Sequence, residues 1–174
     1  MRRIRKKYET PHHPWYKPRL EKEVVIVGEY GLRNKRELWR AETLLKKYKR
    51  FARMLLGMPE DKRKELENQI LNKLKKYGIL PANGKLEDIL DLDVRSVLER
   101  RLQTVVFKKG LAKTIHQARQ LIVHGHIAIN GRRVTSPGYL VPVEEEDAIW
   151  YTPGSPFNDE EKRKILLGGA SEKA

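Results

Sequence analysis

Residues 101–134 constrain the fold of this 174-residue chain more than any other stretch, because they combine a helix capping signal with a hairpin turn signal. Thr114 and Gln117 have the spacing of a capping box, in which each side chain binds a backbone N–H that the first helical turn leaves unpaired. Gly125 marks the far end of that helix. After it, Asn130-Gly131 supplies two residues that tolerate positive φ in a type I′ turn. The stretch therefore predicts a short helix followed by an antiparallel hairpin.

A helix is also expected upstream, from near Asp93 to Gly110, because apolar residues recur there at intervals of three and four. Lys108 and Lys109 would lie in its last turn, where positive charge complements the helix dipole. Helix stability alone could therefore explain these two lysines. Their surroundings favour a ligand instead, since residues 97–142 contain eight Lys or Arg and one acid, whereas a solvated surface usually mixes both signs.

This region resembles the small RNA-binding module named after ribosomal protein S-four. The resemblance runs from about Arg101 to Asp147 and includes the string G-L-A-K-T-x-x-x-A-R-x-L-I-x-x-G-H-I-x-I-N-G-R. It implies a fold of two helices and a small β-hairpin or sheet, within a chain of the α+β class. It also implies an RNA-facing surface on the two helices and the hairpin, formed by Arg101, Lys108, Lys109, Lys113, His116, Arg119, Arg132 and Arg133.

The chain departs from the commonest form of this module at three places. Gln103 stands where Asp or Asn is often found, and Ile115-His116 replaces a pair that resembles Ser-Arg. Glu146 precedes Asp147 where Gly is frequent. These departures leave the fold assignment unaffected.

A longer, strongly basic helix is predicted to begin at Asn34, which again has capping-box spacing with Glu37, and to end at Gly57. Its apolar stripe alternates between intervals of three and four: Leu38, Ala41, Leu45, Tyr48, Ala52 and Leu55. Residues 33–53 contain nine Lys or Arg and two acids, a net charge of plus seven. Like charges at i, i+4 destabilise an isolated helix, and a polyanionic partner would reverse that effect. We expect this helix to bind RNA through Arg36, Arg40, Lys47 and Arg50.

Trp39 and Phe51 lie outside this apolar stripe. Packing within the protein is favoured over base stacking for both, because most large aromatic side chains are buried. A second amphipathic helix is expected between Pro59 and Gly78. Its apolar residues are spaced for burial: Leu66, Ile70, Leu74 and Tyr77.

The segment 23–28, EVVIVG, is ambiguous, since its β-branched residues are typical of a strand. Pro18 as a first-turn residue and Gly31 as a terminator favour a helix instead. A helix would place three apolar residues on one face: Leu20, Val24 and Val27.

The segment 30–42, YGLRNKRELWRAE, resembles the N-terminal domain of small-subunit ribosomal protein S-four in its archaeal and eukaryotic form. The lack of a long extra tail resembles the archaeal form. These patterns divide the chain into four parts. They are a basic arm with a first helix (1–33), a helical domain that binds ribosomal RNA (34–96), the RNA-binding module (97–150) and a C-terminal tail (151–174).

The composition points to a polyanionic partner, because 37 Lys or Arg against 23 Asp or Glu give a net charge of +14. No apolar run of about eighteen residues is present, so we expect no membrane partner. Cysteine is absent, which excludes disulfides and cysteine-ligated zinc. The adjacent His12 and His13 supply no set of four ligands, so we expect no metal.

The sequence contains no nucleophile motif and no Gly-rich phosphate loop, so we expect no catalysis, no cofactor and no small-molecule substrate. One rival is an RNA-modifying enzyme, because pseudouridine synthases carry a similar module, but such an enzyme needs a separate catalytic domain. Another rival is a free-standing RNA-binding protein that rescues stalled ribosomes, which would not need the basic helix at 33–53.

The resemblance implies a structural protein of the small ribosomal subunit, located on the ribosome in the cytoplasm. It implies early, direct binding to small-subunit ribosomal RNA at a multi-helix junction, which helps to organise the body of the subunit. It also implies contact with ribosomal protein S-five in a region tied to decoding accuracy. Other small-subunit proteins, and messenger RNA near the channel by which it enters the subunit, are further implied partners.

Overall fold

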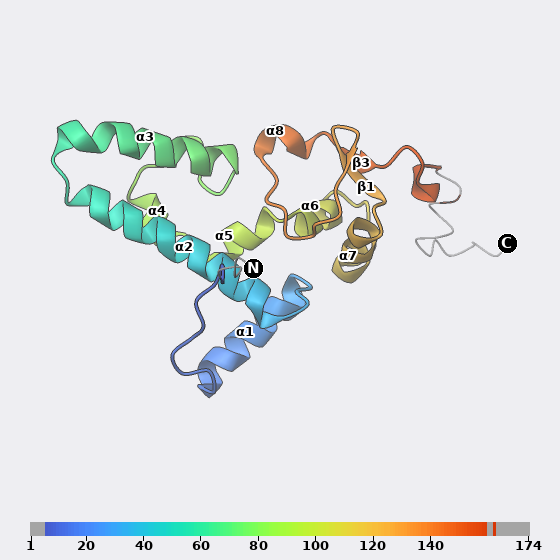
Figure 1. Cartoon of the computed structure of the whole chain (residues 1–174), viewed down its shortest axis with the longest axis horizontal. Helices are drawn as coiled ribbons and strands as arrows, with labels where there is room; N and C mark the ends of the chain where they lie inside the picture. The colour runs from blue at the N-terminus through green and yellow to red at the C-terminus, as the bar shows by residue number, and fades with distance from the viewer. Residues whose placement is uncertain (1–5, 160–161, 163–174) are drawn as a thin grey trace, which may run out of the picture. The chain divides into compact units, whose positions relative to one another are not determined.

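The computed structural model describes residues 6–159 and Lys162. The chain folds as two compact units, residues 1–100 and 101–174. Over the described residues the first unit is helical, and the second combines short helices with a small sheet (Figure 1). The predicted α+β class is therefore confirmed. No helix in the described part of the chain is long and apolar enough to cross a membrane.

The first unit is built around one long helix. Its helices are α1 (Lys17–Glu29), α2 (Lys35–Leu56), α3 (Glu60–Lys76), α4 (Asp88–Asp91) and α5 (Val94–Glu99). The other four all pack against α2. As predicted, the Asn34 side chain accepts a hydrogen bond from the Glu37 N–H at 3.2 Å, and α2 ends at Gly57. The predicted apolar stripe is buried at Leu38, Ala41, Leu45, Ala52 and Leu55.

Helix α1 confirms the helical interpretation of residues 17–31. Pro18 lies in its first turn, and the chain leaves it through Gly31 at a φ of 55°. The helix places Leu20, Val24 and Val27 on one face as predicted, but this face is not fully covered, since Val24 is 60% exposed. The buried residue of α1 is Glu23 instead, because its charge is compensated by cations and a hydrogen-bond donor from α1 and α2.

Helix α3 begins after Pro59 and ends before Gly78, which has a φ of 62°. Leu74 is fully buried, as its spacing predicts, but Leu66 is 41% exposed. The predicted burial of Leu66 is therefore wrong. The main packing partner of α3 is α2, and one neighbouring helix covers only part of its apolar stripe.

The second unit contains α6 (Leu102–Lys108), α7 (Ile115–Val123), α8 (Val143–Glu146) and the short 3-10 helix η1 (Pro156–Asn158). Its strands are β1 (Ile127–Ile129), β2 (Arg132–Arg133) and β3 (Ile149–Tyr151), arranged in the antiparallel order β2-β1-β3. The Thr114 side chain accepts from the Gln117 N–H at 3.1 Å, which confirms the predicted cap of α7. Asn130 and Gly131 have φ values of 50° and 75°, as the type I′ turn requires.

The predicted continuous helix from near Asp93 to Gly110 is wrong in its middle. Two helices occupy this stretch, α5 and α6, and Arg101 between them is extended, with φ −74° and ψ 141°. Arg101 forms a β-bridge with Leu140, and the Leu102 N–H donates to the Tyr139 carbonyl at 2.8 Å. These long-range hydrogen bonds replace the helical ones, which periodicity alone cannot reveal.

The core of the second unit joins α6, α7 and the sheet. Its apolar residues include Leu102, Val106, Leu121, Ile122, Ile127 and Ile149. Tyr151 is buried in this core and Phe157 packs against it, so chain assigned by sequence to a C-terminal tail contributes to the fold as far as η1.

Candidate nucleic-acid interface

Four cations line one face of α2. Arg36, Arg40, Lys47 and Arg50 are all exposed, and helical geometry places them within about 80° of one another around the axis, opposite the buried stripe. Among the described residues none of the four takes part in a salt bridge. Their charges are therefore available to a polyanion. We call these four residues the α2 cationic face.

Other cations of α2 are held by carboxylates. The Lys35 Nζ lies 3.2 Å from the Glu23 Oε2, and the Lys46 Nζ lies 3.9 Å from the Glu9 Oε2. Both carboxylates come from residues that precede α2. The N-terminal segment and α1 thus neutralise part of the helix, and the α2 cationic face stays free of such pairing.

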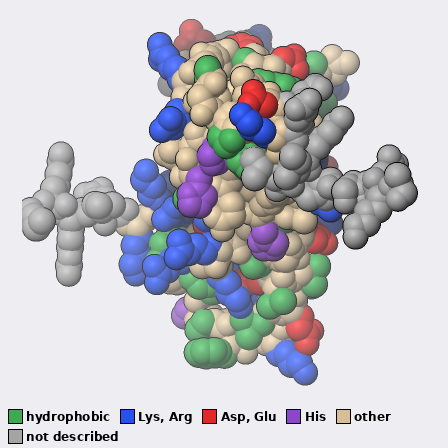
Figure 2. Space-filling model, turned by 90° about the vertical axis from the view of Figure 1, so that its right-hand side faces the viewer, with side chains coloured by type: hydrophobic (Ala, Val, Ile, Leu, Met, Phe, Trp, Pro, Cys, Tyr) green, Lys and Arg blue, Asp and Glu red, His purple; other side chains and the backbone are tan. Residues whose placement is uncertain are grey.

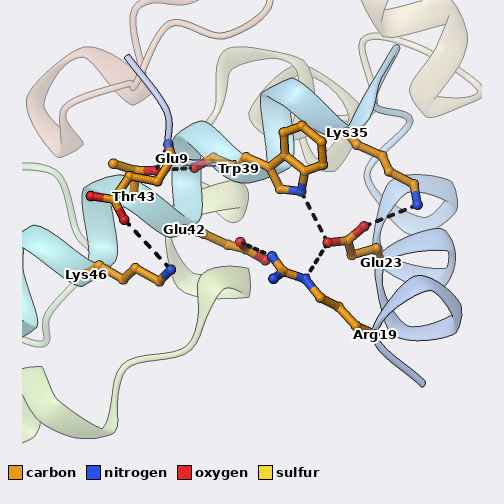
Figure 3. A network of polar contacts seen from close by, with 8 residues as sticks. All are labelled: Glu9, Arg19, Glu23, Lys35, Trp39, Glu42, Thr43 and Lys46. Atoms are coloured by element: carbon orange, nitrogen blue, oxygen red, sulfur yellow. Dashed lines mark hydrogen bonds and ion pairs between the residues drawn. The ribbon is translucent and has the colours of Figure 1, made fainter. Parts of the chain in front are cut away.

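Glu23 is the centre of a polar network between α1 and α2 (Figure 3). Its Oε1 accepts hydrogen bonds from the Arg19 Nε at 2.8 Å and from the Trp39 Nε1 at 3.1 Å, while Lys35 pairs with its other oxygen. Arg19 also reaches the Glu42 Oε2 at 3.2 Å. The network fixes α1 against α2, and it explains the packing that we expect for Trp39.

The described part of the N-terminal arm crosses α2 at Thr43 (Figure 3). The Glu9 N–H donates to the Thr43 Oγ1 at 3.0 Å, and that hydroxyl donates to the Trp39 carbonyl at 2.6 Å. Thr43 lies three residues after Arg40 and four before Lys47. The arm therefore contacts α2 between Arg40 and Lys47, and both of these cations remain exposed.

Burial alone would raise the pKa of Glu23, but the hydrogen bonds from Trp39, Arg19 and Lys35 outweigh it, and the pKa is lowered. A carboxyl whose pKa is lower in the folded state stabilises the fold above its unfolded pKa, about 4.3. The stabilisation is lost as the pH falls through the folded pKa. The α1–α2 contact is therefore sensitive to acid.

We expect Glu23→Gln to lower the free energy of unfolding by about 1–3 kcal/mol near pH 7, because three partly buried donors lose a charged acceptor. The difference from the parent protein should shrink as the pH falls below the unfolded pKa and through the lowered folded pKa of Glu23, because the parent protein then also loses the carboxylate charge. Denaturant unfolding of both proteins at pH 7 and at a series of lower pH values measures this difference in the free energy of unfolding. Glu21→Gln is the matched control, since Glu21 is exposed and lies 4.0 Å from Lys17. A difference that does not change with pH would contradict the assigned role.

In the second unit, Gln103 ties α6 to α7. It is fully buried, its Nε2 donates to the Ile115 carbonyl at 3.1 Å, and its Oε1 accepts from the Arg119 Nη1 at 3.2 Å. Arg119 is consequently half-buried, and this hydrogen bond holds its side chain in place. His116, three residues earlier on α7, is exposed.

Three lysines lie around the ends of α6 and α7. Lys108 and Lys113 are exposed. The Lys109 ammonium donates to the Glu146 carbonyl and lies 3.8 Å from the Asp147 carboxylate. Since Asp147 is fully exposed, this ion pair contributes little stability, and Lys109 stays near the surface.

Arg101 differs from the other sequence-predicted RNA contacts, because only 8% of it is exposed. Its guanidinium lies against Gly138, where an added Cβ would be 3.5 Å from the Nη2. Arg101 is expected on the RNA-facing surface, and this buried placement differs from that expectation. The cause is the β-bridge to Leu140, which draws residue 101 into the fold.

The hairpin presents Arg132 and Arg133 on β2, and both are exposed. The Arg133 side chain runs across Gly125, where a Cβ would meet its Cδ at 2.8 Å, so the glycine leaves room for the arginine. Figure 2 shows exposed Lys and Arg side chains on the face of the molecule that it draws. We call Lys108, Lys109, Lys113, Arg119, Arg132 and Arg133, together with the neighbouring His116, the module cationic surface.

Sequence reasoning missed three polar residues that tie separate segments together around the candidate interface. Glu23 and Thr43 gave no signal, because their roles depend on contacts between separate segments. Gln103 gave a partial one, since it stood out as a departure from the usual residue of the module. In the described residues, no group of three or more His, Asp or Glu could hold a metal ion.

The amino-acid sequence of the chain is similar to those of known proteins. Residues 100–147 match the family described as S4 domain. The small ribosomal subunit protein uS4 of Ignicoccus hospitalis is 56% identical over 156 residues, which cover 90% of this chain and 94% of that protein. The protein of the same name from Sulfurisphaera tokodaii is 57% identical over 157 residues, covering 90% of this chain and 89% of its own length. That from Hyperthermus butylicus is 56% identical over 153 residues, covering 88% and 87%. The chain belongs to the uS4 family of small ribosomal subunit proteins, in its archaeal form.

Proposed function

We propose that the chain is a structural constituent of the small ribosomal subunit, acting on the ribosome in the cytoplasm and not as an enzyme. It binds small-subunit ribosomal RNA through the α2 cationic face and the module cationic surface. The observation that carries the RNA-binding proposal is the alignment of Arg36, Arg40, Lys47 and Arg50, exposed and without described salt-bridge partners, opposite the buried stripe of α2.

The chemistry of the two surfaces fits structured RNA. A-form RNA hides its base edges in a deep, narrow major groove, so proteins recognise it mainly through phosphate and ribose contacts and through shape. Separate cationic surfaces on two folded units can contact several helices of a junction at once. We therefore assign residues 34–96 and 97–150 to one RNA, as two linked binding sites whose affinities reinforce each other.

We infer the individual protein and RNA partners from the family and from the charge of the surface. We assign protein contacts to the acidic segment 144–147, which includes most of α8, because Glu144 and Asp147 are exposed. Ribosomal protein S-five and other small-subunit proteins are the proposed neighbours, with influence on translational accuracy. Messenger RNA near the channel by which it enters the subunit is a further proposed contact.

The rival functions are less well supported. A free-standing factor or RNA-modifying enzyme would share the S4 domain alone, whereas the relatives named as ribosomal proteins match about 90% of the chain. The basic helix α2, which a free-standing factor would not need, lies within the matched length.

Direct binding to naked RNA tests the proposed role in nucleating assembly of the subunit body. We expect the purified chain to bind small-subunit ribosomal RNA without any other protein, and to resist competition by an equal mass of large-subunit ribosomal RNA. A filter-binding titration with both competitors measures this. Binding that appears only after other small-subunit proteins are added would contradict a primary role in assembly.

A further inference from the structure

An apolar groove lies between α2 and α3 in the first unit and encloses about 300 Å³. Its walls are formed by Tyr48, Phe51, Met54 and Leu55 of α2 and by Leu66, Gln69, Ile70 and Lys73 of α3. Phe51 is 50% exposed and Met54 is 45% exposed. The expected packing of Phe51 within the protein is therefore wrong, because half of its surface remains open.

The groove continues the α2 cationic face. Phe51 follows Lys47 by four residues, and Met54 follows Arg50 by four, so each apolar side chain lies one helical turn beyond a cation on the same side of α2. Lys73 contributes a cation from the opposite wall. No described Asp or Glu lines the groove.

The aromatic residues of the groove offer two kinds of contact. Phe51 presents an open ring on which a planar base can stack. Burial raises the pKa of the Tyr48 phenol, and Tyr77 adds to the effect. The phenol therefore stays neutral near pH 7, where it can donate a hydrogen bond.

We propose that this groove takes one unpaired base of the bound ribosomal RNA, stacked on Phe51, while Lys47, Arg50 and Lys73 hold the adjoining phosphates. The inference rests on the proposed function and adds a subsite to it. Bases that leave RNA helices are commonly stacked on aromatic side chains while nearby cations bind the backbone.

The charge of the rim favours RNA over an apolar protein segment. A protein segment would need apolar side chains for the groove and several acids for the cations on its two walls. An RNA strand carries a phosphate at every nucleotide, so it supplies negative charge along its whole length. A strand whose phosphates bind Lys47 and Arg50 along α2 would therefore reach the groove with its next nucleotides.

The test uses the full chain with small-subunit ribosomal RNA. Phe51→Ala should weaken binding by about 5- to 150-fold, which is the range for removing one base-stacking aromatic. The slope of log affinity against log salt should not change, because no phosphate contact is lost. Phe51→Tyr should bind like the parent protein, since it keeps the ring. Leu56→Ala is the control, because Leu56 is a partly exposed apolar residue of α2 that does not line the groove.

Unfolding curves for all variants check that folding is intact, as expected for a half-exposed side chain. Ultraviolet cross-linking followed by mass spectrometry should place a nucleotide on Phe51 or Tyr48. Unchanged affinity for Phe51→Ala would overturn the subsite while leaving the proposed function standing, provided that loss of the α2 cationic face still weakens binding. A protein occupant would be indicated if Phe51→Ala impaired subunit assembly and left RNA affinity intact, which also overturns the subsite.

Discussion

Replacing Arg36, Arg40, Lys47 and Arg50 together by glutamine should weaken binding to small-subunit ribosomal RNA by about 10²- to 10³-fold at 0.15 M salt. Each cation that neutralises a phosphate releases counterions, and four such contacts account for roughly this loss. The slope of log affinity against log salt should become shallower by about three units. Filter binding at several salt concentrations measures both quantities. Folding should be retained, because all four side chains are exposed.

The matched control removes cations from outside the proposed interface. Lys64, Lys76 and Lys85 are exposed and belong to the first unit, and none is a proposed RNA contact. Their triple glutamine variant should lower affinity only slightly, through the change in net charge. An equal loss per charge in the control and in the α2 variant would show that binding depends on total charge and not on the α2 cationic face.

The second large effect concerns the core of the module. Leu121→Ala should cost about 2–5 kcal/mol in the free energy of unfolding, because Leu121 is 4% exposed in the core and its removal leaves a cavity. The thermal midpoint of the second unit should fall by roughly 4–8 °C for each kcal/mol lost. Scanning calorimetry and far-ultraviolet circular dichroism measure the change.

Lys113→Ala is the companion variant, since Lys113 is exposed two residues before α7. It should change the midpoint by little and weaken RNA binding, which is the opposite pattern to Leu121→Ala. If Lys113→Ala unfolded the second unit and left binding by the folded fraction unchanged, the surface assigned to this part of the module would be wrong.

Local signals in the sequence predicted the ends of most elements. Asn34, Thr114 and the Asn130-Gly131 turn act through contacts within a few residues, and each is found as expected. The buried stripe of α2 follows from periodicity, because one side of a long helix packs on its neighbours. Arg36, Arg40, Lys47 and Arg50 lie outside this apolar stripe in the sequence, and all four are exposed in the structure.

Contacts between distant segments could not be predicted in the same way. The break between α5 and α6 depends on the pairing of Arg101 with Leu140, and nothing local distinguishes it from a continuous helix. Leu66 and Phe51 are exposed because α3 and α2 leave a groove between them. The spacing of apolar residues shows which face of a helix can be buried. The fraction of that face that is buried depends on how the neighbouring elements pack.

The candidate site shows the same division. Exposed cations such as Lys108 and Arg132 are recognisable from charge and spacing. The partial burial of Arg119 follows from its hydrogen bond to Gln103, sixteen residues away. The sequence therefore predicts which surfaces are cationic, and the fold decides how far each side chain can reach.

A salt titration of the intact chain with small-subunit ribosomal RNA tests most directly whether both cationic surfaces bind one RNA. If together they neutralise about ten phosphates, log affinity should fall against log salt with a slope of roughly −7 to −9. The variant with Arg36, Arg40, Lys47 and Arg50 replaced by glutamine should keep only the part of this slope that comes from the module cationic surface. A slope near −2 for the intact chain, about what two or three phosphate contacts produce, would contradict binding through two surfaces.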